Sequence, residues 1–345
     1  MTLTLASARA ISQSRQSLDR RRPGTSAQDL ADHLDATGWL RTLGGIEGYV
    51  ALHNRVAGIT RGCVDTALAN GAIRVMPAVR GCIYLVPRRM TGVLLRIAEH
   101  LNRRRIDAEM AKLGCPREEL QTLGIAILEG LAAGALSTDK LKKALPAGLV
   151  RGFGEAGKKM GVSSNLPSAL RDLEFAGKVE RVLADGGLDC QSYLWRRAAS
   201  DPMVGVPADP LDWMIEVGRS YWRHAGFADR ADFADWAGIS QKDAKAVTAA
   251  LALVPVTIEG WGKDVYALPE VLDTVGPSPT AAVRLLRFED NLYALHGSVA
   301  PFVDARDGDV VVRGWGNGRA PVSLAMAKHV ESRTITTEGR IAGLW

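Results

Sequence analysis

The feature that most constrains this chain is a short unit in which a helix stops and a strand begins at once. In "LPSALRDLEFAGKVERV" (166–182), the apolar spacing predicts a helix that ends at Gly177, a residue that leaves a helix easily in left-handed geometry. Alternating residues from Val179 then predict a strand, and "LDCQSYLWRR" predicts the strand that returns. The unit is therefore a helix followed by a β-hairpin.

The same unit occurs twice more in the chain. "VDTALANGAIRV" is followed by "RGCIYLVP", and "AVTAALALVPVTI" is followed by "KDVYALP". The three returning strands carry Tyr84, Tyr193 and Tyr266, and their spacing of 109 and 73 residues is too irregular for a solenoid. Helices followed by a hairpin are the plan of the winged helix, whose second helix commonly enters the DNA major groove. Winged helices also bind proteins, so the pattern alone leaves the partner open.

The chain has 345 residues, enough for several domains. Residues 1–110, 111–200 and 201–275 each contain one of the units, and we predict a winged helix in each. Residues 276–345 change to short strand patterns with Gly and Asn turns, which predict a β-rich domain. The predicted class is α+β. Trp213, Trp222 and Trp236 lie among apolar neighbours in helical patterns, so we predict that they are core residues.

Positive charge is concentrated near the start of the chain. Residues 1–110 hold 16 Arg and no Lys against nine acidic residues, a net charge of +7, and the rest of the chain is net −2. A GC-rich genome also favours arginine codons, but it does not explain the local excess of charge. The guanidinium group pairs well with phosphate oxygens, so we expect phosphate contacts. The candidate DNA-binding residues are Arg41, Arg80, Tyr84, Arg103, Arg104, Arg171, Lys178 and Arg181.

Two of these candidates have a structural alternative. Arg80 stands beside Gly81 and either reaches phosphate or forms an ion pair with Asp65 or Glu47. Tyr84 either stacks on a base or packs under the wing, and the tyrosines of the other two units favour packing.

Several kinds of chemistry have no sequence signal. The four cysteines form no CxxC pair, the six histidines show no ligand spacing, and neither a GxxxxGK[ST] loop nor a GxGxxG after a strand occurs. We therefore expect no metal and no small-molecule cofactor. No apolar run of 18 residues occurs and the N-terminus lacks a signal-peptide core, so we expect no membrane partner and a cytoplasmic, nucleoid-associated protein.

Five stretches resemble a known family in the same order along the chain. They are "ATGWLRTLGGIEGYVALHNRVAGIT", "RGCIYLVP", "YWRHAGFADRADFADWAGI", "DNLYALH" and "GRIAGLW". They are similar to the bacterial winged-helix DNA-binding family that includes the AlkZ/YcaQ-type DNA glycosylases, which unhook alkylated bases and interstrand crosslinks. The resemblance implies three tandem winged helices and a small C-terminal β-barrel-like domain, forming a clamp around double-stranded DNA, plain or damaged. It also implies a role in DNA repair.

The catalytic pair of that family is missing from the matching positions. The glycosylases carry a Gln-x-Gln motif that holds and activates water, and an ungapped comparison places its two ends on Leu40 and Thr42, around Arg41. Neither side chain is a general base near neutral pH. A gapped comparison places the ends on Glu47 and Tyr49 instead, which makes Glu47 a candidate base.

Two further positions depart from the family and three match it. Tyr84 stands where the family often has histidine, and Glu289 stands where it has an aromatic residue. Asp290, Asn291 and His296 match the pattern.

Three functions follow from these observations. The first is a DNA-binding clamp without the glutamine pair. The second is an active glycosylase for alkylated bases with a rearranged site, which needs a polar pocket around residues 38–49, 80–84 and 290–296 to hold an extruded base. The third is a non-enzymatic scaffold or regulator that binds protein.

Overall fold

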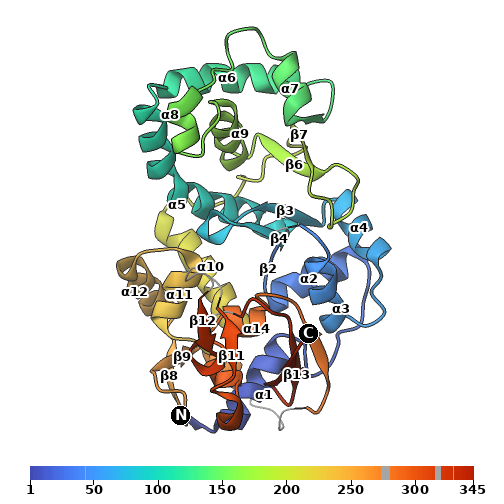
Figure 1. Ribbon diagram of the computed structural model, residues 1–345, viewed down its shortest axis with the longest axis vertical. Helices are drawn as coiled ribbons and strands as arrows, with labels where there is room; N and C mark the ends of the chain where they lie inside the picture. Colours follow the sequence, from blue (N-terminus) through green and yellow to red (C-terminus); the bar gives the residue numbers. More distant parts are fainter. Residues whose placement is uncertain (43, 273–279, 315–319, 329) are drawn as a thin grey trace.

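The computed structural model describes residues 1–42, 44–272, 280–314, 320–328 and 330–345. Helices and small sheets share the molecule, as the predicted α+β class requires (Figure 1). Three groups of helices each end in a hairpin, and a region of short strands follows. Helices α6 to α9 lie at one end of the long axis, and α1, β8 and β9 lie near the other (Figure 1). None of the described helices has the length and apolarity needed to span a bilayer.

The first group surrounds a three-stranded sheet of order β2-β4-β3. Its elements are α2 (Ala27–Thr37), β2 (Leu40–Arg41), α3 (Glu47–Arg55), α4 (Arg61–Ala69), β3 (Ile73–Pro77) and β4 (Ile83–Pro87). Ser26 caps α2 in a reciprocal capping box with Asp29, which satisfies two backbone donors at the helix start. Leu30, Leu52 and Leu85 are fully buried between the helices and the sheet.

The N-terminal segment joins a distant part of the chain. Strand β1 (Thr2–Leu3) pairs in parallel with β8 (Val254–Ile258), and helix α1 (Leu5–Arg15) packs against α10 (Pro210–Ala225). The pairing places β1 at the edge of the third hairpin, in a sheet of order β1-β8-β9. The predicted section 1–110 thus contains elements of two groups, and the predicted boundaries stay predictions.

The second group follows the 22-residue helix α5 (Thr91–Lys112). Its elements are α6 (Arg117–Gly130), β5 (Leu136–Ser137), α7 (Thr138–Ala144), α8 (Gly154–Lys159), α9 (Leu166–Phe175), β6 (Val179–Leu183) and β7 (Tyr193–Arg197). Helix α9 stops where the sequence predicts: Gly177 has φ +67°, and a Cβ at that position would lie 2.6 Å from Pro202. Leu170 and Phe175 are buried against α6 and α5, so the helix faces the bundle as predicted.

The third group comprises three helices and a hairpin. Its elements are α10, α11 (Arg230–Ala237), α12 (Gln241–Ala250), β8 and β9 (Val265–Ala267), followed by α13 (Pro269–Leu272). Trp213, Trp222 and Trp236 are at most 7% exposed, which confirms them as core residues. Tyr84 lies in β4, Tyr193 in β7 and Tyr266 in β9, so each returning strand carries its tyrosine as predicted.

The C-terminal region forms two small sheets. Its elements are β10 (Arg284–Leu286), α14 (Asn291–Ala294), β11 (Val311–Arg313), β12 (Pro321–Ser323), β13 (Thr334–Thr337) and β14 (Arg340–Leu344). Strands β10, β13 and β14 form one antiparallel sheet, and β11 and β12 form another. These described strands do not close on themselves, so the expectation of a barrel-like domain is not confirmed.

Candidate functional site

The two positions of the ungapped catalytic comparison lie on and just after β2. Leu40 is 1% exposed and pairs with Leu85 of β4, within the apolar core of the first group. Thr42 is 4% exposed, its amide donates to the carbonyl of Ile83, and its hydroxyl accepts from the amide of Gly44 at 3.4 Å. Neither side chain can activate water, because one is a hydrocarbon and the other is a buried hydroxyl held by the backbone.

Arg41, between these positions, forms an ion pair across the molecule. Its Nη1 donates to both carboxylate oxygens of Glu289, at 2.8 and 2.6 Å, and the Glu289 side chain is only 6% exposed. Glu289 takes a φ of +50°, an unusual backbone conformation for a residue with a side chain. Glu289 is also the position where the family resemblance led us to expect an aromatic residue. The carboxylate there balances the charge of Arg41.

Arg287 binds the backbone of Arg41, next to this ion pair. Its Nη1 donates to the carbonyl of Arg41 at 2.5 Å, its Nε donates to the carbonyl of Phe288, and the residue is 4% exposed. Burial lowers the pKa of Arg287, and the nearby Asp290, Glu47 and Glu289 oppose that shift. The loop after β10 therefore contacts β2 in two ways: through the ion pair of Glu289 with Arg41 and through the hydrogen bond from Arg287 to the Arg41 carbonyl.

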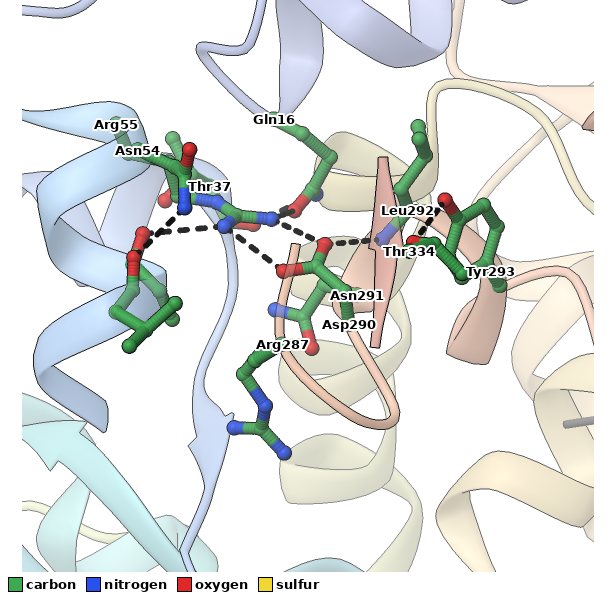
Figure 2. Close-up of polar contacts among 12 residues, drawn as sticks. Gln16, Thr37, Asn54, Arg55, Arg287, Asp290, Asn291, Leu292, Tyr293 and Thr334 are labelled. Carbon is green, nitrogen blue, oxygen red and sulfur yellow. Dashed lines mark hydrogen bonds and ion pairs between the residues drawn. The ribbon is translucent and has the colours of Figure 1, made fainter. Parts of the chain in front are cut away.

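A second ion pair beside it is completely buried (Figure 2). Arg55 of α3 meets Asp290 at 2.6 and 3.0 Å, and their side chains are 1% and 0% exposed. Gln16 accepts a hydrogen bond from Arg55 at 3.1 Å and donates its amide to the carbonyls of Thr37 and His224. Asp290 also caps α14 through the amide of Leu292.

The other two motif residues are structural as well. Asn291 donates to the carbonyl of Trp39 at 3.1 Å and is 7% exposed. His296 is 2% exposed and packs among the rings of Phe227, Trp261 and Phe302, and burial lowers its pKa to about 3. In this chain the matching motif therefore connects α1, α3, α10 and the C-terminal region.

The gapped comparison places its two residues on opposite sides of α3. Glu47 accepts from Arg333 through Oε1, and its Oε2 is buried without a hydrogen-bond partner among the described residues. Tyr49 donates to Asp65 and accepts from the amide of Leu188 at 2.7 Å. Burial raises the pKa of Tyr49 to about 12. Glu47 and Tyr49 therefore do not converge on one point, as a pair holding a water must.

Tyr84 is 5% exposed in the main core, and burial raises its pKa. It lies opposite Arg41 in the strand register, which favours packing over base stacking. Arg80 has φ +56° and meets Asp235 at 3.1 Å, so its partner is neither of the two carboxylates that the sequence suggested.

The remaining predicted DNA-binding residues differ in whether a carboxylate already pairs with them. Arg103 pairs with Asp172 at 2.6 Å, and Arg181 pairs with Glu174 while stacking on Tyr193 and Trp195. Lys178 is exposed and lies 3.9 Å from Asp201. Arg104 and Arg171 are exposed and have no carboxylate within 4.0 Å among the described residues. Arg104 and Arg171 therefore keep a cation free for a ligand, and the distant pair of Lys178 leaves it partly so.

Sequence reasoning missed Arg287, Asp235 and Arg333, each of which contacts a predicted site residue. It also missed Gln16, which binds Arg55, the partner of Asp290. These contacts join residues between 39 and 286 positions apart, so no local signal marked them. No group of three or more metal-ligating side chains occurs within the described part of the chain.

Comparison with known proteins places this arrangement in context. The family described as DNA glycosylase AlkZ-like matches residues 45–345, a range that begins after Leu40 and Thr42 and includes Glu47. The solved structure of the Streptomyces sahachiroi DNA glycosylase AlkZ superposes with a TM-score of 0.73 at 18% identity, covering 100% of this chain and 88% of that one. No curated protein matches the chain. Because the family match spans most of the sequence, the chain belongs to the DNA glycosylase AlkZ-like family.

Proposed function

We propose that this protein binds double-stranded DNA as a clamp of three winged helices and lacks the glutamine chemistry of its family. Family membership supports the DNA partner, and the three helix-and-hairpin groups support the winged-helix assignment. A DNA-binding role also suits a cytoplasmic, nucleoid-associated protein.

The residues on and just after β2 are the observation that supports the loss of the glutamine chemistry. A hydrolytic site needs a side chain that positions water and accepts its proton. Leu40 is buried in the core, Thr42 is held by backbone contacts, and Arg41 is bound by Glu289. This stretch therefore offers no free acceptor to a water.

Phosphate contacts are best supported on α5 and α9. Arg171 on α9 is partly exposed, and partial burial, then Arg105 and Arg181, lower its pKa, while Glu174 and Glu109 oppose the shift. Because no carboxylate lies within 4.0 Å of Arg171 among the described residues, its guanidinium can donate to a phosphate oxygen. Arg104 on α5 is a second exposed cation of the same helix pair.

We expect Arg171→Gln to weaken binding to every duplex sequence alike. One lost phosphate contact should reduce the slope of log affinity against log salt by about 1. Fluorescence anisotropy of a labelled duplex at four salt concentrations measures that slope. Lys158→Gln is the matched control, since it removes one charge from the same group at a side chain already paired with Glu155. An unchanged slope in Arg171→Gln would exclude this face.

One observation favours a second candidate, an active glycosylase with a rearranged site. The buried Oε2 of Glu47 has no hydrogen-bond partner among the described residues, so this carboxylate keeps an unused acceptor. Arg333 competes with a water for this carboxylate, because its guanidinium already donates to Oε1.

A duplex with and without N7-alkylated guanine separates these functions. Binding anisotropy and alkali-revealed strand breaks are measured on the same samples at two salt concentrations. Salt-sensitive binding without breaks supports the clamp. Breaks above the no-protein control that disappear in Glu47→Gln establish the glycosylase. Absence of binding at low salt refutes both and leaves the protein-binding scaffold.

A further inference from the structure

A concave pocket of about 630 Å³ lies between α3, α4 and β10, apart from the predicted catalytic positions on β2. Its walls include Tyr49 and His53 of α3, Leu285 of β10 and the indole of Trp345. The volume lies within the range of small-molecule sites, and neither Leu40 nor Thr42 lines it.

The apolar wall of this pocket is unusually open to solvent. Val283 is 61% exposed, Leu285 is 46% exposed and Trp345 is 46% exposed. Large apolar side chains gathered at one concave place, with charged residues around them, mark a binding site more often than a bare surface.

The indole of Trp345 is held in place for stacking. The guanidinium of Arg333 lies 5.0 Å from its ring centroid, and Arg333 is itself anchored by Glu47. The backbone amide of Trp345 donates to the carbonyl of Arg333 at 3.0 Å. A fixed, half-exposed indole is a good platform for a flat aromatic group, because little conformational entropy is lost on stacking.

The rim beside this platform carries two arginines, Arg21 and Arg284, whose positive charge Asp19 offsets in part. Arg21 lines the pocket, and its neighbour Arg284 has a pKa lowered by burial and then by the charge of Arg21. The Nε atoms of both side chains are buried without a hydrogen-bond partner among the described residues. Asp19 lies near Arg284, and the third cation, Arg61, is already paired with Asp65 and Asp189. An anion would therefore be attracted to Arg21 and Arg284.

We propose that this pocket binds a nucleotide, with its base against Trp345 and its phosphate toward Arg21 and Arg284. The pocket offers few free groups to distinguish one base from another. The amide of Asn54 is used by the carbonyls of Val50 and Leu285, and the hydroxyl of Tyr49 is used by Asp65. Stacking without directional hydrogen bonds tolerates every base, so binding is expected to be insensitive to base identity.

Two ligands would present the same base and phosphate to the pocket: a free mononucleotide and an unpaired nucleotide in DNA. The probe for the first is 2-aminopurine deoxyriboside 5′-monophosphate, whose fluorescence is quenched on stacking. The matching nucleoside without phosphate tests the charge. The probe for the second is a duplex with an unpaired 2-aminopurine overhang, compared with a duplex in which the same base is paired. All are titrated with the full-length chain.

Trp345→Ala is expected to lower the affinity for the probe about tenfold, the loss typical of one base–aromatic stack. Arg21→Gln should lower the affinity for the monophosphate but leave the affinity for the nucleoside unchanged. Met326→Ala is the matched control, because Met326 is a 75% exposed apolar residue that does not line the pocket. Both test side chains are partly exposed, so neither change should unfold the chain.

Quenching of the free monophosphate identifies a small-molecule site, and quenching of the overhang alone identifies an unpaired nucleotide in DNA. Quenching of neither probe, or equal affinity in wild type and Trp345→Ala, overturns the assignment. Plain duplex binding is measured in parallel. Since a free nucleotide needs no duplex, loss of the clamp and loss of this pocket are separate results.

Discussion

Asp290→Ala is expected to lower the free energy of unfolding by about 3–5 kcal/mol, the typical cost of removing one partner of a buried ion pair. The change leaves the guanidinium of Arg55 in a site where it is 1% exposed, and within the described part of the chain its remaining partners are Gln16 and the carbonyl of Ala51. It also removes the cap of α14, which adds to the loss. Urea unfolding at neutral pH measures the change.

The double variant Arg55→Met, Asp290→Leu separates the cost of an orphaned charge from the value of the pair. Replacing both partners with apolar residues removes the buried charge altogether, so its cost should be much smaller than that of Asp290→Ala. Glu155→Ala is the surface control. The side chains of Glu155 and Lys158 are 79% and 73% exposed, and such a pair should change stability by no more than about 0.5 kcal/mol. A double variant as unstable as the single one would contradict this account.

The local parts of the fold were predictable because local chemistry determines them. Gly177 ends α9 and releases the chain into β6, and the hairpins follow from alternation and turn residues. The side-chain direction of α9 followed from its spacing, since Leu170 and Phe175 are buried. The pairing of β1 with β8 joins residues 255 positions apart, and a strand of only two residues, Thr2–Leu3, gives no sign of such a partner.

The candidate site was only partly predictable for the same physical reason. Arg41 was recognised as a charged residue in a family position, but its partner Glu289 is 248 positions away. In the structure Arg41 and Glu289 form one ion pair. In the sequence the two residues are far apart and nothing connects them. Asp290 was recognised from the family pattern, whereas its role as the partner of a buried Arg55 required the folded chain.

The second large effect is expected on acidification, from three buried histidines. Burial lowers the pKa values of His33, His224 and His296 to about 3 in the folded protein. Nε2 of His224 faces the carbonyl of Asp35, so this nitrogen donates the hydrogen bond. In the unfolded chain each histidine titrates near 6.5. The unfolded state therefore binds more protons below that pH.

The sign of the effect follows from that difference. Stability is greatest above pH 6.5 and falls as the pH drops toward 3, because each proton taken up by the unfolded chain favours unfolding. Between pH 7 and pH 5 each histidine should cost about 2 kcal/mol, and the three together about 6 kcal/mol. Asp232 opposes the trend, since burial raises its pKa to about 6 and the folded state gains about 1 kcal/mol by protonating it.

Urea unfolding at pH 7, 6 and 5 tests this expectation. His296→Gln should remove about 2 kcal/mol of the pH dependence, whatever it does to stability at pH 7, because one titrating group is lost. His100→Gln is the matched control, since His100 is exposed. Equal slopes in the wild type and in His296→Gln would mean that the histidine is protonated in the folded state. The ring cluster of Phe227, Trp261 and Phe302 would then have to accommodate a cation.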